Sequence, residues 1–202
     1  MADTLAPLLA DPHRHLRFVN IAGGPAMDNM NALILLNKNQ PGILAHRKVS
    51  IDVLDLNDEG PAFGQNALNA LTGAGGPLQG MQVAFRHVCY NWAETAHLES
   101  VPREAHADGS LAMCSSEGGL FEYGSDSEIE ANLRVLRPFA EILAVVGSVT
   151  RADEPTQRCG RPALLPRGLG GAGGFSHSGV QQAGWDVSRV VERPFSDQVV
   201  LT

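Results

Sequence analysis

Two glycines near the start of the chain are placed where a small ligand could approach the backbone. Gly23 and Gly24 follow an apolar run that is typical of a strand, and a helix-like segment begins just after them. Glycine permits a sharp turn with no side chain in the way. The segment has neither the G-x-G-x-x-G pattern of dinucleotide sites nor the GK[ST] of phosphate loops. Asp28 in the first helical turn also disfavours a pyrophosphate. The turn therefore favours a less negatively charged ligand, such as a sugar-linked purine carrying an amino acid; a plain strand-to-helix corner is the alternative.

A carboxylate ends the next predicted strand. Asp55 closes the β-branched run from Val49 to Leu56, where the chain leaves a buried strand. An acidic side chain at that place can accept hydrogen bonds from both hydroxyls of a ribose. The alternative role, N-cap of the following helix, can be taken by Asn57 or Asp58 instead.

A third group of chemically capable residues follows the predicted fourth strand. Ser115, Ser116 and Glu117 precede two glycines, so this loop can bring backbone and a carboxylate close to a substrate. Glu117 is the best candidate for a general base; the alternative is a solvated loop acid or a helix cap. In the third strand, Arg86 and His87 are adjacent, so we expect one to face the site and the other to be structural.

Short apolar runs alternate with helix-like segments along most of the chain. Such alternation predicts an α/β sheet, mostly parallel, with an antiparallel strand added late. Ligands of such sheets lie at the carboxyl ends of the strands, so the turns above are the expected site. The strands are predicted at 17–22, 49–56, 81–90, 110–115, 142–149, 185–191 and 198–201, and the helices at 26–37, 58–71, 94–107 (partial), from Ser125 or Asp126 to Pro138, and at 175–183.

Composition narrows the class of protein. The chain has 202 residues, enough for one domain, which we place at 17–202 after a short leader at 1–16. Its net charge of −7 with 15 scattered Lys and Arg argues against a nucleic-acid partner. The start of the chain is not a secretory signal, and no apolar stretch is long enough to span a membrane, so a cytoplasmic protein is expected.

Neither the cysteines nor the histidines predict a metal site. The three cysteines, Cys89, Cys114 and Cys159, are widely spaced without a CxxC pair, so reduced thiols are expected. His13 and His15 lie in a polar leader with no carboxylate or cysteine motif nearby. We therefore predict no bound metal.

The order of these features resembles the class I S-adenosylmethionine-dependent methyltransferases, and more locally a bacterial group of uncharacterised methyltransferase-like proteins. The segments that carry the resemblance are NIAGGPAMDNMNALI, VLDLNDEGPAFGQNAL, SSEGGLFEYGSD and VVGSVTR. The resemblance implies a Rossmann-like doubly wound sheet of seven strands in the order 3-2-1-4-5-7-6. In the family's first motif an acidic residue precedes G-x-G-x-G; here Asn20, Ala22, Gly24 and Ala26 stand at those places.

The resemblance also assigns roles to residues. Asp55 would hold the ribose of S-adenosylmethionine and Leu56 would flank the adenine, while Asn91 stands where an acid often contacts the adenine amino group and Trp92 or Tyr90 offers an apolar face. The implied cofactor-binding residues are Asn20, Ala22, Gly23, Gly24, Pro25, Asp55, Leu56, Asn91, Trp92 and Ser115, and the implied substrate-binding residues are Ser116, Glu117, Tyr123 and Arg151.

The leading hypothesis is a methyltransferase that acts on a small molecule and that could form a homodimer. One alternative is a non-catalytic methyltransferase-like protein that keeps the fold for binding or dimerisation. A nicotinamide-dependent reductase is the second alternative; it would use the same ribose acid but requires a G-x-G-x-x-G turn that this sequence lacks.

Overall fold

A seven-stranded mixed sheet organises the part of the chain that the structure, a computed structural model, describes: residues 1–150, 177–194 and 196–202. Its strand order is β3-β2-β1-β4-β5-β7-β6. The first five strands run parallel, and β7 pairs antiparallel with both β5 and β6. The strands are β1 (Leu16–Ile21), β2 (Val49–Asp55), β3 (Val83–Cys89), β4 (Leu111–Ser116), β5 (Leu143–Thr150), β6 (Val187–Glu192) and β7 (Ser196–Leu201). The expected fold class and strand order are confirmed.

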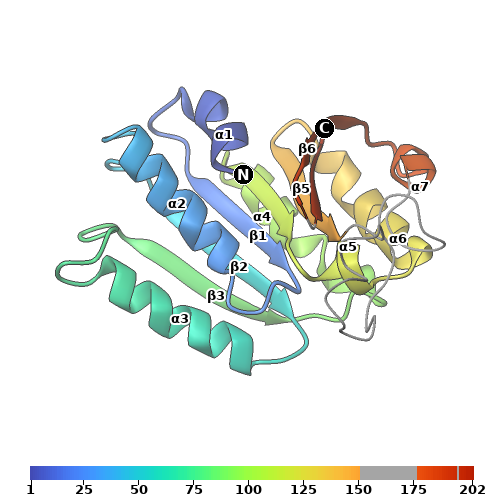
Figure 1. Cartoon of the computed structure of the whole chain (residues 1–202), viewed down its shortest axis with the longest axis horizontal. Helices are drawn as coiled ribbons and strands as arrows, with labels where there is room; N and C mark the ends of the chain where they lie inside the picture. The colour runs from blue at the N-terminus through green and yellow to red at the C-terminus, as the bar shows by residue number, and fades with distance from the viewer. Residues whose placement is uncertain (151–176, 195) are drawn as a thin grey trace.

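Helices cover both faces of the sheet (Figure 1). One apolar cluster packs the N-terminal helix, α2 and α3 on one face, and a second packs α4, α6 and α7 on the other. The helices are α1 (Ala2–Leu5), α2 (Met27–Asn39), α3 (Glu59–Thr72), α4 (Ser100–Ala107), α5 (Leu120–Tyr123), α6 (Asp126–Leu136) and α7 (His177–Gln182), with short 3-10 turns at Ala6–Leu9, Thr95–His97 and Arg137–Phe139. Burial on two faces explains why the central strands are rich in apolar residues.

Local signals in the sequence set both ends of α6. Ser125 caps α6: its hydroxyl accepts from the Glu128 backbone nitrogen while the Glu128 carboxylate accepts from the Ser125 nitrogen, a complete capping box. The α-helix ends at Leu136, two residues before Pro138, and the chain continues as the 3-10 turn Arg137–Phe139.

Side chains from the first sixteen residues are part of the apolar core. Leu5 and Leu9, from α1 and the turn after it, are buried in the cluster that also holds α2. Arg47 secures this segment, because its guanidinium donates to the backbone oxygens of Leu9 and Asp11. The leader therefore packs against the domain.

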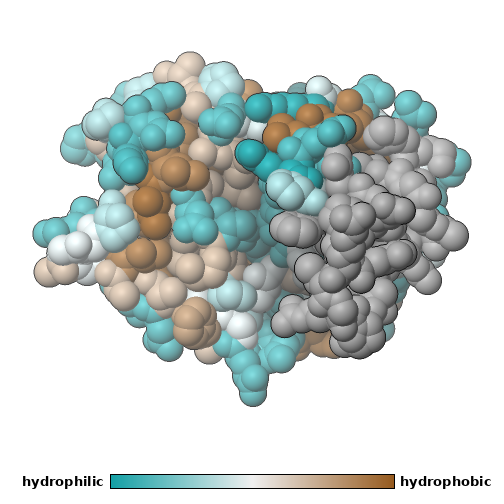
Figure 2. Space-filling view, viewed as in Figure 1, coloured by the Kyte–Doolittle hydropathy of each residue, from teal (hydrophilic) through white to brown (hydrophobic). Residues whose placement is uncertain are grey.

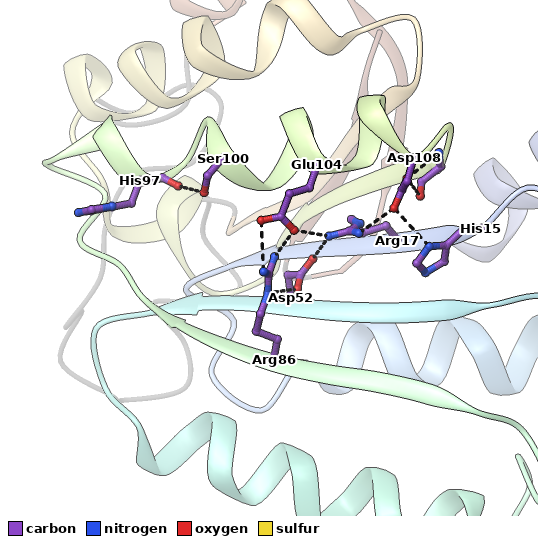
Figure 3. Close-up of polar contacts among 9 residues, drawn as sticks. His15, Arg17, Asp52, Arg86, His97, Ser100, Glu104 and Asp108 are labelled. Carbon is purple, nitrogen blue, oxygen red and sulfur yellow. Dashed lines mark hydrogen bonds and ion pairs between the residues drawn. The ribbon is translucent and has the colours of Figure 1, made fainter.

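An ionic network joins α4 to the sheet (Figure 3). Asp52 of β2 is nearly inaccessible and accepts from Arg17 at 3.1 Å and from Arg86 at 2.7 Å. Both arginines also reach Glu104 of α4, and Arg17 reaches Asp108 just after that helix. Two cations of the sheet thus meet Glu104 of α4 and Asp108 just after it, and these ion pairs join the helix to β1 and β3.

The face that carries α2 and α3 mixes hydrophilic and hydrophobic residues (Figure 2). Met27, Leu35 and Phe63 are the large apolar side chains that these two helices expose. No helix in the described ranges combines the length and apolar character needed to cross a bilayer.

Candidate functional site

The turn between β1 and α2 has the backbone of a three-glycine motif. Ala22, Gly24 and Ala26 have φ angles of 55°, 54° and 53°, all in the left-handed region. These are the three glycine places of G-x-G-x-G, so the alignment inferred from sequence coincides with the conformations that glycine accommodates most easily. Alanine in this region is strained by about 1–2 kcal/mol per residue. The chain keeps the shape of the motif with only one of its three glycines.

Helix α3 packs directly on this turn. A Cβ at Gly60 would lie 2.9 Å from the Gly24 Cα, and one at Gly64 would lie 2.4 Å from the Pro25 oxygen. Both distances are shorter than real Cβ contacts, so glycine is required on this face of α3. The turn is therefore clamped between β1 and the start of α3.

Asp55, at the carboxyl end of β2, is tied to the same turn. One carboxylate oxygen accepts from the Gly24 nitrogen at 3.1 Å and the other accepts from the Asn57 nitrogen at 2.9 Å. Asn57 in turn accepts from the Glu59 nitrogen at the start of α3. Asp55 therefore does not cap α3, but it is also not a free carboxylate: each oxygen already accepts one bond and retains capacity for a second.

A cavity of about 830 Å³ opens at the carboxyl ends of the strands on this side of the sheet. It is lined by Ala22, Asp55, Leu56, Asn57, Asp58, His87, Cys89, Tyr90, Asn91 and Trp92. Five residues expected at a cofactor site from the sequence thus share one cavity: Ala22 from the turn, Asp55 and Leu56 after β2, and Asn91 and Trp92 after β3. Leu56 is 68% exposed and free to cover a ligand.

His87 and Cys89 also line the cavity; the sequence left open whether His87 or Arg86 faces it and gave Cys89 no binding role. They alternate along β3 with Arg86, whose side chain joins the ionic network on the opposite face. The expectation that one of Arg86 and His87 faces the site therefore describes the structure, and the two-residue period of a strand decides which. The ring of His87 is held by the Asp55 backbone oxygen at 2.9 Å.

Asn20 organises a buried polar cluster on the other side of the turn. Its side-chain oxygen accepts from the Gly23 nitrogen at 2.8 Å, and its amide nitrogen lies 3.0 Å from Asp28 Oδ1, 2.9 Å from Asn29 Oδ1 and 3.3 Å from Ser115 Oγ. Asn20 and Ser115 are fully buried and are direct neighbours in the β1–β4 pairing. This is the point where the strand order reverses, at which ligands of open α/β sheets bind.

Asp28 is the unusual member of this cluster. Burial raises the pKa of the Asp28 carboxyl to about 6, the Ser115 hydroxyl opposes the rise, and the negative charge of Glu117 adds to it. Its Oδ2 atom is inaccessible to solvent and has no hydrogen-bond partner in the described part of the chain. Sequence reasoning used Asp28 only to argue against a pyrophosphate.

The polar residues of the loop after β4 differ in their exposure to solvent. Ser116 is buried and accepts from the Phe121 nitrogen, whereas Tyr123 is 53% exposed. Glu117 accepts from Gln198 at 3.4 Å and acts electrostatically on Asp28. Gly119 brings the loop against β1, because a Cβ there would lie 2.6 Å from the Ala22 oxygen. Arg151 lies outside the described residues.

A larger cavity, about 1070 Å³, lies at the opposite ends of the strands and is bordered by His15, Lys48 and Met81 among others. It sits where β2 and β3 begin, whereas parallel sheets bind ligands at the carboxyl ends of their strands. The smaller cavity is therefore the candidate site.

No group of three or more potential metal ligands occurs within the described ranges. Cys89 and Cys114 are free thiols, the first exposed and the second buried, and burial raises the pKa of Cys114. Cys159 lies outside the described residues.

Three solved structures are similar to the chain. The O-methyltransferase NcsB1 from neocarzinostatin biosynthesis, in complex with S-adenosylmethionine and 2-hydroxy-5-methyl naphthoic acid, is 16% identical with a TM-score of 0.52, over 100% of this chain and 55% of that one. The mycolic acid cyclopropane synthase CmaA1, complexed with S-adenosylhomocysteine and CTAB, is 11% identical with a TM-score of 0.49, over 93% and 60%. A candidate sarcosine dimethylglycine methyltransferase from Galdieria sulphuraria is 12% identical with a TM-score of 0.48, over 96% and 63%.

The chain thus spans between 55% and 63% of the length of these proteins. No protein-family model matches the sequence, and no curated protein matches it significantly. At such low identity the similarity concerns the fold alone. The NcsB1 comparison and the strand order together identify this fold. The chain has the Rossmann-like fold of the class I S-adenosylmethionine-dependent methyltransferases.

Proposed function

We propose that this protein binds S-adenosylmethionine and transfers its methyl group to a small-molecule acceptor. The observation that carries the proposal is the convergence of the glycine-shaped turn and Asp55 on one cavity at the carboxyl ends of β1, β2 and β3. A cytoplasmic location and a homodimer remain predictions.

The residues around the cavity suit the adenosine part of this cofactor. Asp55 has acceptor capacity left for ribose hydroxyls after its bonds to Gly24 and Asn57. Leu56 and Trp92 supply apolar surface for a purine, and Asn91 lies beside them with an amide that can pair with a ring edge. Small pockets of this kind, mostly apolar with a few polar groups, are typical of cofactor sites.

The cofactor supplies an activated methyl group on a sulfonium, and the protein's part is alignment and exclusion of water. The close approach of Gly119 to the Ala22 oxygen supports a role for the loop after β4 next to the turn. Ser116 and Glu117 are the proposed substrate-side residues, with Tyr123 and Arg151. Glu117 takes a proton from the acceptor if the acceptor carries one.

Isothermal titration calorimetry with four ligands tests the proposal: S-adenosylmethionine, S-adenosylhomocysteine, adenosine and NAD. We expect heat with the first three and none with NAD. A response to NAD alone would replace the proposal with the nicotinamide-dependent reductase. Silence toward every adenosine-containing ligand would refute cofactor binding.

Turnover is tested separately, by mass spectrometry of a library of small acceptors incubated with the protein and S-adenosylmethionine. A product heavier by one methyl group is expected. Tight binding without turnover of any acceptor would favour the non-catalytic binding protein over the enzyme.

A further inference from the structure

The larger cavity, of about 1070 Å³, differs in charge from the protein as a whole. The chain has 22 acidic residues against 15 Lys and Arg, yet among the described residues no Asp or Glu borders this cavity. Arg47 and Lys48 do border it, together with the imidazoles of His15 and His46. A concave surface lined by charges of one sign raises the local concentration of the opposite ion. The cavity therefore favours a negatively charged ligand.

The strand register brings the polar groups of this cavity together. The strands β1, β2 and β3 begin in register, because their first residues are paired with one another. His15, Lys48 and Gln82 each lie one position before those first residues. Neighbouring strands are about 4.8 Å apart, so these three residues form a row along the amino-terminal edge of the sheet. Lys48 stands in the middle of that row.

The positive charge at this edge is not neutralised by the protein. Arg47 is buried, and its guanidinium donates to backbone oxygens, which are neutral acceptors. Lys48 is exposed and, like Arg47, forms no ion pair within the described ranges. Asp11 and Asp108 border an adjoining cavity of about 420 Å³, and Asp108 is already paired with Arg17. Both cations therefore keep their charge for a ligand.

The carboxyl-terminal end of α3 also borders the cavity, and the partial negative charge of a helix end opposes an anion. The backbone oxygens of Asn69, Leu71 and Thr72 at this end already accept hydrogen bonds from nitrogens of the segment that follows the helix. The charge of a helix end amounts to about half an elementary charge. The two full charges of Arg47 and Lys48 outweigh it.

An apolar surface lies beside the cations. Leu68 of α3 is buried, and Met81 and Val83 are partly buried against the same apolar cluster. Pockets for small organic ligands typically combine such apolar walls with a few polar groups, in volumes of about 300–1,000 Å³. The cavity is thus large enough for an organic molecule and is not shaped for a simple ion alone.

We propose that this cavity binds a small organic anion. Its carboxylate or phosphate head group is bound by Lys48 and His46, and its apolar body lies against Met81 and Val83. The site is at the opposite ends of the strands from the cavity that holds Asp55, so the inference goes beyond the proposed function and does not depend on it.

Four probes separate the contribution of the head group from that of the apolar body: octyl phosphate, octanoate, inorganic phosphate and octanol. Each is titrated calorimetrically into the full chain. We expect octyl phosphate or octanoate to bind at least about fivefold more tightly than inorganic phosphate and octanol, and the tighter of the two identifies the head group. Added sodium chloride should weaken this binding, because it screens the exposed cation.

Lys48→Gln removes the charge at the proposed head-group position and should weaken binding of the tighter probe by about fivefold or more. Lys38→Gln is the matched control, because Lys38 is the other lysine of the chain, is exposed in the last turn of α2 and borders neither of the two adjoining cavities. Its effect should stay within about twofold.

His46→Asn is the second variant, and it should weaken the same probe in the same direction. His46 has a φ of 62°, and asparagine accepts this left-handed conformation more readily than most residues, so the change removes the imidazole without adding strain. Circular dichroism checks that each variant is folded.

Several results would overturn the inference. Neither amphiphilic anion binds, or Lys48→Gln has no larger effect than Lys38→Gln. Octanol that binds as tightly as the anions would remove the role of the charge, and inorganic phosphate that binds as tightly would remove the role of the apolar wall. Adenosine should not displace the anion, because displacement would place it in the cavity that holds Asp55. Failure to bind S-adenosylmethionine would overturn the proposed function and leave this inference standing.

Discussion

The Asp55 carboxylate and the Gly24 backbone nitrogen are joined by a hydrogen bond of 3.1 Å, which connects the end of β2 to the turn after β1. The contact links the glycine turn and Asp55, the two sequence features from which a ligand site was inferred. It also means that Asp55 shapes the turn, in addition to the ribose binding that we propose for it.

Asp55→Asn should therefore affect binding more than folding. Asparagine retains one oxygen to accept from Gly24 or Asn57, but it has no charge and fewer acceptor sites for ribose hydroxyls. We expect the dissociation constant for adenosine measured by calorimetry to rise about tenfold or more. Glu99→Gln, which removes an exposed charge outside the cavity, is the control. An unchanged affinity in Asp55→Asn would refute the ribose assignment.

Ala22→Gly should maintain or raise stability, against the usual trend. Ala22 has a φ of 55°, where alanine is strained by about 1–2 kcal/mol, and glycine removes that strain at some cost in chain entropy. We expect the free energy of unfolding in urea to stay equal or to rise by about 1 kcal/mol. Ala70→Gly, at an exposed position inside α3, should lower it by about 1 kcal/mol. Equal losses in both variants would argue against strain at the turn.

Asp28→Asn should stabilise the free protein at neutral pH. Burial raises the pKa of the Asp28 carboxyl to about 6, so the folded state holds a proton that the unfolded state, with its ordinary pKa of 3.8, has lost. This contribution is fully present below about pH 4 and is lost as the pH rises through about 6. The neutral variant should therefore gain up to about 3 kcal/mol over wild type at pH 7.5.

The measurement is the difference in free energy of unfolding between variant and wild type from pH 4 to pH 8. Taking the difference removes the pH dependence that the other acids contribute to the free energy of unfolding. Glu104 is one of these acids; burial raises its pKa, but contacts with Arg86 and Arg17 outweigh burial and lower it. A difference that does not change with pH would show that Asp28 titrates normally.

Asp52→Asn should destabilise the protein strongly. The Asp52 side chain is only 3% exposed and accepts from both Arg17 and Arg86, so neutralising it leaves buried cationic charge without its main partner. Losses of about 3–5 kcal/mol are typical when one member of a buried pair is removed, and the remaining contacts to Glu104 reduce the expected loss to about 2–4 kcal/mol.

Glu99→Gln provides the contrast on the same helix region, because Glu99 forms an exposed pair with Arg103. Its effect on urea unfolding should remain below about 0.5 kcal/mol. A small effect of Asp52→Asn, comparable to this control, would show that the network does not hold α4 to the sheet.

The sequence alone predicted the seven strands, the longer helices and their order in the chain, but not the short helices α1 (Ala2–Leu5) and α5 (Leu120–Tyr123). Apolar runs and helical spacing located the strands within one to two residues, because local periodicity reports burial directly: the run at 49–56 became β2 (Val49–Asp55), and the serine before α6 became its cap. The strand order followed from the family resemblance, and the structure confirms it. Asp55, Leu56, Asn91 and Trp92 could be named because they directly follow strands whose carboxyl ends share one edge.

Only the tertiary structure decided how the polar residues between those strands are used. Whether His87 or Arg86 faces the cavity depends on the pleat of β3 in the sheet. That Asp28 is held by Asn20, eight positions earlier, depends on how α2 folds back over β1 and on the burial of Asn20. Burial and pairing are properties of the packed molecule, and they alone bring this first-turn acid against Asn20 and bury its Oδ2 atom.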